Sequence, residues 1–192
     1  IGKRPIDYHL NAFRKLNIEQ EFEGEDNSII HCKTTEIIGN DIFLEFPSVG
    51  ATQNIILASV LSTGITRIFN AAREPEVTEL CNFLIEAGAR ICGKGSAFIE
   101  VEGVEKLHKV EFTLSSDRIV AGTYMAAVAA TGGNVLLTGV PVCHIESTIR
   151  VLRRVGCGID VLKDSLRISQ NKRPLSLDQL KTQPYPGFPT DM

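Results

Sequence analysis

The sequence lacks an excess of positive charge and has no long apolar run. Its 20 Lys and Arg residues are outnumbered by 23 Asp and Glu residues, which gives a formal net charge of −3 at pH 7. Nothing in this balance favours nucleic acid or a membrane surface as a partner. No apolar stretch reaches the roughly 18 residues that a membrane-spanning helix needs. We therefore expect a protein with no nucleic-acid partner and no membrane partner.

The cysteines and histidines are too scattered to form a metal site. There is no Cys-x-x-Cys pair, and the four histidines do not cluster at ligand spacing. Each cysteine falls in an apolar strand or helix pattern, so we expect reduced core thiols in a cytoplasmic protein that binds no metal. The five are Cys32, Cys81, Cys92, Cys143 and Cys157.

Motifs for nucleotide cofactors and for Ser-His-Asp hydrolysis are also missing. The sequence contains neither a Walker loop nor Gly-x-Gly-x-x-Gly, and Gly93-Lys94-Gly95 fits a hairpin turn. Motif spacing alone therefore identifies no catalytic set.

What the sequence does contain is an internal repeat. Gly64 and Gly132, like Gly88 and Gly156, are 68 positions apart. In each copy a polar turn precedes an apolar helix that ends at the first glycine, and a short strand follows. Both helices have small residues and Leu on all sides, which predicts burial of both faces. The helices are expected over 55–63 and 123–131, and the strands over 65–71 and 134–140.

The second part of each copy is a helix with one apolar stripe, followed by a hairpin. Pro75 fits the first helical position, and apolar residues then recur at helical spacing up to Gly88. The expected helices cover 74–88 and 144–156, and the expected hairpins cover 89–103 and 158–169. Residues 5–32 have the pattern of the end of an earlier copy, with a helix that stops at Asn17. We expect an α/β (α+β) fold of repeated βαβαββ units packed around buried helices, in a fragment of a longer protein.

The stretch Pro47–Thr52 lies where a strand gives way to a helix. Backbone N–H groups at a helix start point outward without partners, and a phosphate can bind there when no bulky side chain blocks it. Gly50 removes one such obstacle. Ser48 is equally suited to cap the helix, as Asp117 is in the next copy, so capping and anion binding both stay open.

Two further stretches carry candidate groups. Lys3 and Arg4 precede a helix, and Arg offers a planar fork suited to phosphate or carboxylate, although a solvated basic pair is the alternative. Asp191 follows Thr190 in a stretch rich in Pro and Gly, where a carboxylate is either a general base or an ordinary loop residue.

Five segments together resemble the UDP-N-acetylglucosamine 1-carboxyvinyltransferase family of enolpyruvyl transferases. They are IGKRPIDYHL, FPSVGAT, NAAREPEV, DRIVAGTYMAAVAATGG and PYPGFPTDM, and they span nearly the whole chain in order. The resemblance implies transfer of enolpyruvyl from phosphoenolpyruvate to the 3-hydroxyl of UDP-N-acetylglucosamine, in the first committed step of peptidoglycan synthesis. It also implies a monomer without a cofactor or metal, with two domains shaped as inside-out α/β barrels and the site in the cleft between them.

The resemblance assigns roles to particular residues. It places Arg4 against phosphoenolpyruvate and makes Asp191, next to Thr190, the general base near the sugar hydroxyl. The segment that cradles the uridine corresponds to Pro5, Ile6, Asp7 and Tyr8. The loop that meets the diphosphate corresponds to Phe46, Pro47, Ser48 and Val49, with Gly50 beside it.

The sequence departs from the family pattern in two respects. The early Lys-Asn pair that meets phosphoenolpyruvate in the family is missing, and so is the reactive Cys of the mobile loop. The family's mobile loop carries a reactive Cys shortly before the Ile-Gly with which this sequence opens, so the fragment alone is expected to be inactive. Residues 1–114 would then be the C-terminal part of the first domain, and 115–192 the N-terminal part of the second. The alternatives are enolpyruvylshikimate phosphate synthase, a catalytically inactive paralogue that binds nucleotide sugars, and a purely structural repeat protein.

Overall fold

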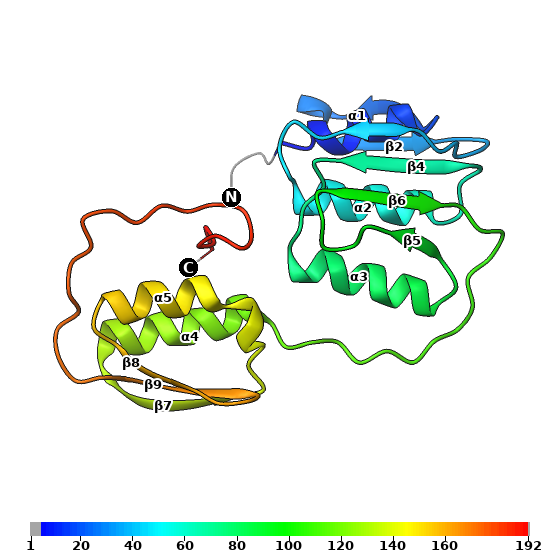
Figure 1. The fold of residues 1–192 in the computed structure, drawn as a ribbon. Helices are drawn as coiled ribbons and strands as arrows, with labels where there is room; N and C mark the ends of the chain where they lie inside the picture. The colour runs from blue at the N-terminus through cyan, green and yellow to red at the C-terminus, as the bar shows by residue number, and fades with distance from the viewer. Residues whose placement is uncertain (1–4, 192) are drawn as a thin grey trace. The chain divides into compact units, whose positions relative to one another are not determined.

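A computed structural model of the chain describes residues 5–191, which fall into two compact units (Figure 1). Unit 1 covers 1–112 and unit 2 covers 113–192. The elements of unit 1 are α1 (Asp7–Lys15), β1 (Glu19–Glu23), η1 (Glu25–Asn27), β2 (Ile29–Lys33), β3 (Asp41–Phe43), α2 (Val49–Ser59), β4 (Ile65–Phe69), α3 (Pro75–Glu86), β5 (Arg90–Cys92) and β6 (Phe98–Glu102).

Unit 1 contains one complete βαβαββ repeat. Strands β3 and β4 pair in parallel across the α2 connection, and β6 then pairs antiparallel with both β4 and β5. The resulting sheet order is β3-β4-β6-β5, while β1 and β2 form a separate antiparallel hairpin. Helix α2 packs against β4 and β6 and lies between α1 and α3, so its inner side forms the centre of the core.

Unit 2 repeats the second part of this arrangement. Its elements are α4 (Arg118–Thr131), β7 (Gly133–Thr138), η2 (Val142–His144), α5 (Glu146–Arg154), β8 (Gly158–Val161) and β9 (Ser165–Gln170). The antiparallel order β7-β9-β8 matches β4-β6-β5 of unit 1, and both helices lie on one face of the sheet (Figure 1). Residues 107–116 form no strand, so this copy lacks a counterpart of β3.

The predicted left-handed helix stops are confirmed in all three copies. Asn17, Gly88 and Gly156 have φ of 65°, 102° and 99°. In each case the next residue donates its N–H to a carbonyl five residues back, as in the bonds from Ala89 to Leu84 and from Cys157 to Leu152. This is the Schellman pattern, which satisfies carbonyls that the helix end leaves unpaired. The sequence repeat therefore corresponds to a repeat of local geometry.

Two expectations for the apolar helices were wrong. Helix α2 ends at Ser59 rather than at residue 63, because Ser62 turns back and donates both its N–H and its hydroxyl to the Ser59 carbonyl. Burial is also one-sided: Leu57 is 49% exposed on α2, and Tyr124 is 61% exposed on α4. The strands and helices that contact α2 and α4 within each unit therefore leave part of each helix surface uncovered.

The core-thiol expectation was right for only two of the five cysteines. Cys81 and Cys157 are buried, and burial raises the pKa of Cys81 to about 11. Cys32 and Cys92 lie at solvent-facing positions of strands, and Cys143 lies in the short helix η2, so these three are exposed. Strand alternation explains the exposure of Cys92, because this residue follows the buried Ile91 and every second residue of a strand faces away from the core.

Candidate functional site

The start of α2 is capped by Ser48. The Ser48 backbone is extended, and its hydroxyl accepts a hydrogen bond of 3.3 Å from the Ala51 N–H. Its carbonyl accepts from the Thr52 hydroxyl at 2.7 Å, and the same hydroxyl accepts from the Ala72 N–H at 3.0 Å. Thr52 thereby joins the start of α2 to the loop that follows β4. The first N–H groups of the helix still point outward, so capping and anion binding remain compatible.

The ring of His9 lies directly against Gly50. A Cβ on Gly50 would come within 3.2 Å of the His9 Cε1 and 3.5 Å of its Nε2. The Asn54 amide donates to the His9 Nδ1 at 2.8 Å, which holds the ring at this place. The His9 ring can come this close only because position 50 carries a small residue. The edge of the imidazole ring therefore lies beside the N-terminal end of α2.

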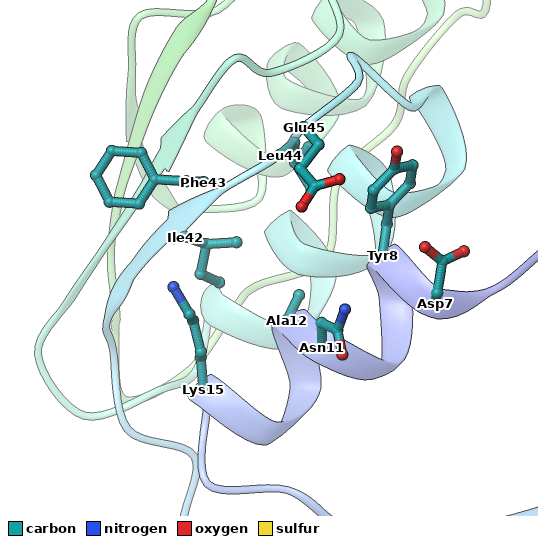
Figure 2. Close-up of a pocket in the computed structure, with 9 residues that line it drawn as sticks. All are labelled: Asp7, Tyr8, Asn11, Ala12, Lys15, Ile42, Phe43, Leu44 and Glu45. Atoms are coloured by element: carbon teal, nitrogen blue, oxygen red, sulfur yellow. The ribbon is translucent and has the colours of Figure 1, made fainter.

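One of the two predicted segments of unit 1 contributes to a pocket of about 80 Å³ (Figure 2). Helix α1 lines one wall and the stretch from β3 toward α2 lines the other, as Figure 2 shows. Among the predicted residues, Asp7 and Tyr8 line this pocket, and Phe46–Gly50 follow its last residue, Glu45. The lining residues are Asp7, Tyr8, Asn11, Ala12, Lys15, Ile42, Phe43, Leu44 and Glu45.

Sequence reasoning predicted Asp7 and Tyr8 but missed three polar residues of this pocket, Asn11, Lys15 and Glu45. Asp7, Asn11 and Lys15 follow one another at intervals of four, so they share one face of α1. That spacing was a usable signal. Lys15 donates to the Asp41 carbonyl at 3.3 Å, and its Nζ lies 5.7 Å from the centre of the Phe43 ring. The pocket thus offers carboxylates, an amide and an ammonium group beside an aromatic ring.

The remaining predicted residues of unit 1 flank the pocket or fall outside the described chain. Pro5 and Ile6 precede α1 and are exposed, and Phe46 is 53% exposed. Pro47, Ser48 and Val49 are half-buried. Arg4 and Lys3 lie outside the described residues.

In unit 2 the start of α4 differs from that of α2. The Asp117 carboxylate accepts from the N–H groups of Ile119 and Val120 at 2.7 Å and 3.1 Å, which confirms the predicted cap. A carboxylate that occupies these donors repels a phosphate. Thr190 and Asp191 are exposed and follow the loop 182–188 at the end of the described chain.

No group of His, Cys, Asp and Glu within residues 5–191 is arranged to hold a metal ion. The helices over the same residues include none of the length and apolar character needed to span a membrane.

Comparison with known proteins identifies the family. The whole chain, residues 1–192, matches the family model of EPSP synthase (3-phosphoshikimate 1-carboxyvinyltransferase). The chain belongs to this family. It is 49% identical to UDP-N-acetylglucosamine 1-carboxyvinyltransferase 2 of Caldanaerobacter subterraneus subsp. tengcongensis and 43% identical to the enzyme of that name from Nocardia farcinica. The alignments cover the whole of this chain but only 45% and 44% of those two proteins, respectively. The chain therefore spans less than half of their length.

Solved structures of the family have the same fold. The enolpyruvyl transferase NikO from Streptomyces tendae superposes with a TM-score of 0.74 at 20% identity, over 86% of this chain and 42% of that chain. EPSP synthase from Acinetobacter baumannii gives 0.64 at 21% identity, over 86% and 40%. The predicted family resemblance and the predicted α/β fold class are thereby confirmed.

Proposed function

We propose that the protein carrying this sequence transfers the enolpyruvyl group of phosphoenolpyruvate to the 3-hydroxyl of UDP-N-acetylglucosamine, the first committed step of peptidoglycan synthesis. One observation carries the proposal: the full chain is 41–49% identical to several proteins named for this acceptor. Residues 1–114 then belong to the first domain of a monomeric enzyme and 115–192 to the second. Exposed free thiols at Cys32, Cys92 and Cys143 suit the reducing cytoplasm.

The geometry of unit 1 supports nucleotide binding. The pocket beside Asp7 and Tyr8 suits the uridine, and the start of α2 at Ser48–Gly50 suits the diphosphate, because unpaired N–H groups and the helix dipole favour an anion there. The His9 edge adds a polar group at the same place. Binding energy from the nucleotide then orients the sugar hydroxyl.

The chemistry proceeds by addition and elimination. Phosphoenolpyruvate gains a proton at its methylene carbon, so its central carbon becomes open to attack. Asp191 takes the proton of the sugar hydroxyl as that oxygen bonds to the central carbon. Arg4 offsets negative charge on the phosphate in the tetrahedral intermediate. Loss of the added proton and of inorganic phosphate then regenerates the double bond in the product.

Phosphate release with alternative acceptors tests the proposal. The protein expressed from its complete reading frame is given phosphoenolpyruvate with either UDP-N-acetylglucosamine or 3-phosphoshikimate, the acceptor after which EPSP synthase is named. We expect release only with the nucleotide sugar. Release only with 3-phosphoshikimate would make the protein an EPSP synthase. Nucleotide-sugar binding without any release would make it an inactive paralogue.

A further inference from the structure

The segment that leads to Asp191 has almost no regular structure. Residues 171–191 include no helix and no extended strand. Their one β-type pairing is an isolated bridge between Thr182 and Phe188. Hydrogen bonds between paired strands therefore do not fix the position of the Asp191 carboxylate. Its position depends on how the preceding loop is closed and on what that loop touches.

The loop 182–188 is closed by two hydrogen bonds of its own. The Gln183 N–H donates to the Phe188 carbonyl at 2.9 Å, and the Gly187 N–H donates to the Pro184 carbonyl at 2.8 Å. Gly187 has no room for a side chain, because a Cβ would lie 2.5 Å from the Gln183 Cβ. The loop is thus a compact body with Tyr185 near its tip.

Tyr185 packs against two elements of unit 2. Its hydroxyl shares a hydrogen bond of 3.3 Å with the His144 Nδ1, and the two rings lie edge to face with centres 6.3 Å apart. The Arg118 guanidinium, at the start of α4, lies 5.5 Å from the centre of the Tyr185 ring. Such cation–π and edge-to-face contacts are directional, so they orient the ring as well as hold it.

A second contact holds the loop through the backbone of Gly187. The Ser147 hydroxyl, in the first turn of α5, donates to the Gly187 carbonyl at 3.1 Å. The loop is therefore attached to α4, η2 and α5 together, just before the chain reaches Asp191.

We propose that Tyr185 is a positioning residue for Asp191. The inference rests on the proposed function, in which Asp191 accepts the proton of the sugar hydroxyl. Proton transfer requires the carboxylate within hydrogen-bond reach of that hydroxyl, and a displacement of about 1 Å costs on the order of 100-fold in rate. Loss of the Tyr185 contacts loosens the loop, which Ser147 still holds at Gly187, and lowers kcat. The nucleotide is bound by other residues, so KM stays nearly constant.

Three variants of the protein from the complete reading frame separate this role from a general effect on folding. Tyr185→Ala removes the ring, Tyr185→Phe keeps the ring but removes the hydroxyl, and Leu180→Ala truncates an exposed side chain in the same segment. We expect kcat to fall about 100-fold for Tyr185→Ala and about 10-fold for Tyr185→Phe, with KM within about 3-fold of the wild-type value. Leu180→Ala should match the wild type.

Two further measurements test the link to Asp191 and the docking itself. In an Asp191→Glu background, whose carboxylate is already displaced, the loss caused by Tyr185→Ala should shrink, because coupled residues are not additive. In the protein from the complete reading frame, trypsin should cleave after Lys181 faster in Tyr185→Ala than in Leu180→Ala.

Several results would overturn the proposal: an unchanged kcat in Tyr185→Ala, a rise in KM alone, or fully multiplicative losses with Asp191→Glu. Unchanged cleavage at Lys181 would overturn the docking without reference to activity. A wild-type protein that releases no phosphate would instead refute the proposed function, and the cleavage assay would still decide whether Tyr185 docks the loop.

Discussion

Replacing Ser48 with Asp separates the two roles open to this residue. Asp and Ser are about equally good helix caps, so the free energy of unfolding should stay within about 0.5 kcal/mol of the wild-type value. Asp117 provides the geometry: its carboxylate takes the second and third N–H groups of α4 at 2.7 Å and 3.1 Å. A carboxylate at position 48 would take the equivalent N–H groups, those of Gly50 and Ala51.

The same change should nearly abolish nucleotide binding. A carboxylate about 5 Å from a phosphate charge costs roughly 3 kcal/mol at an effective dielectric constant of about 20. The loss of a donor at Gly50 adds to this cost, so the Kd for UDP-N-acetylglucosamine should rise at least about 100-fold. Ser48→Asn is the matched control, because it caps the helix without a charge, and its Kd should rise by no more than about 10-fold.

Two measurements on the same preparations decide the outcome. Urea denaturation gives the free energy of unfolding, and titration calorimetry gives the Kd for the nucleotide sugar. Equal affinity in the Asp and Asn variants would show that the diphosphate does not lie at the start of α2. A loss of more than about 1 kcal/mol of stability in the Asp variant would refute the capping argument.

Four other predictions have definite expected outcomes. Asp191→Asn should abolish phosphate release while nucleotide binding, measured by calorimetry, stays near the wild-type value. Because burial raises the pKa of Cys81 to about 11, this thiol should react with an aromatic disulfide reagent far more slowly at pH 8 than the exposed cysteines. The folded state favours the protonated Cys81 thiol, so the stability that this group contributes should be present below pH 9 and lost as pH rises toward 11, which urea denaturation can follow. Gly103→Ala should destabilise unit 1 by about 3 kcal/mol or more, since its Cβ would lie 1.7 Å from the Ser62 carbonyl oxygen. Gly64→Ala meets nothing within 4 Å, so its cost of about 1–2 kcal/mol comes only from the left-handed backbone at Gly64, where φ is +88°. Thermal melting of both variants tests this difference.

Local geometry was the most predictable part of the fold. Asn17, Gly88 and Gly156 marked helix ends because few residue types tolerate positive φ, and Asp117 marked a helix start because its carboxylate suits the first N–H groups. These signals depend on one residue and its immediate neighbours, so they can be recognised directly in a sequence.

Burial and the composition of the site were less predictable. Leu57 has an apolar pattern around it, yet it is exposed because exposure depends on which other elements cover a helix, and that is a property of the tertiary arrangement. The pocket was missed for the same reason: the four-residue spacing puts Asn11 and Lys15 on one helix face, but it does not show that β3 lies opposite that face. The contact between His9 and Gly50 likewise joins residues from two helices, so the sequence around either residue does not predict it.

The positions of the three tyrosines allow their intrinsic fluorescence to report on the candidate regions. The sequence has no Trp and only three Tyr residues. Tyr8 lines the pocket of unit 1, Tyr185 anchors the loop before Asp191, and Tyr124 is largely open to solvent. Emission in the near ultraviolet therefore comes from both candidate regions and one reference position. Single Tyr→Phe replacements would assign each contribution, so ligand arrival at the pocket and release of the loop can be followed separately without an attached dye.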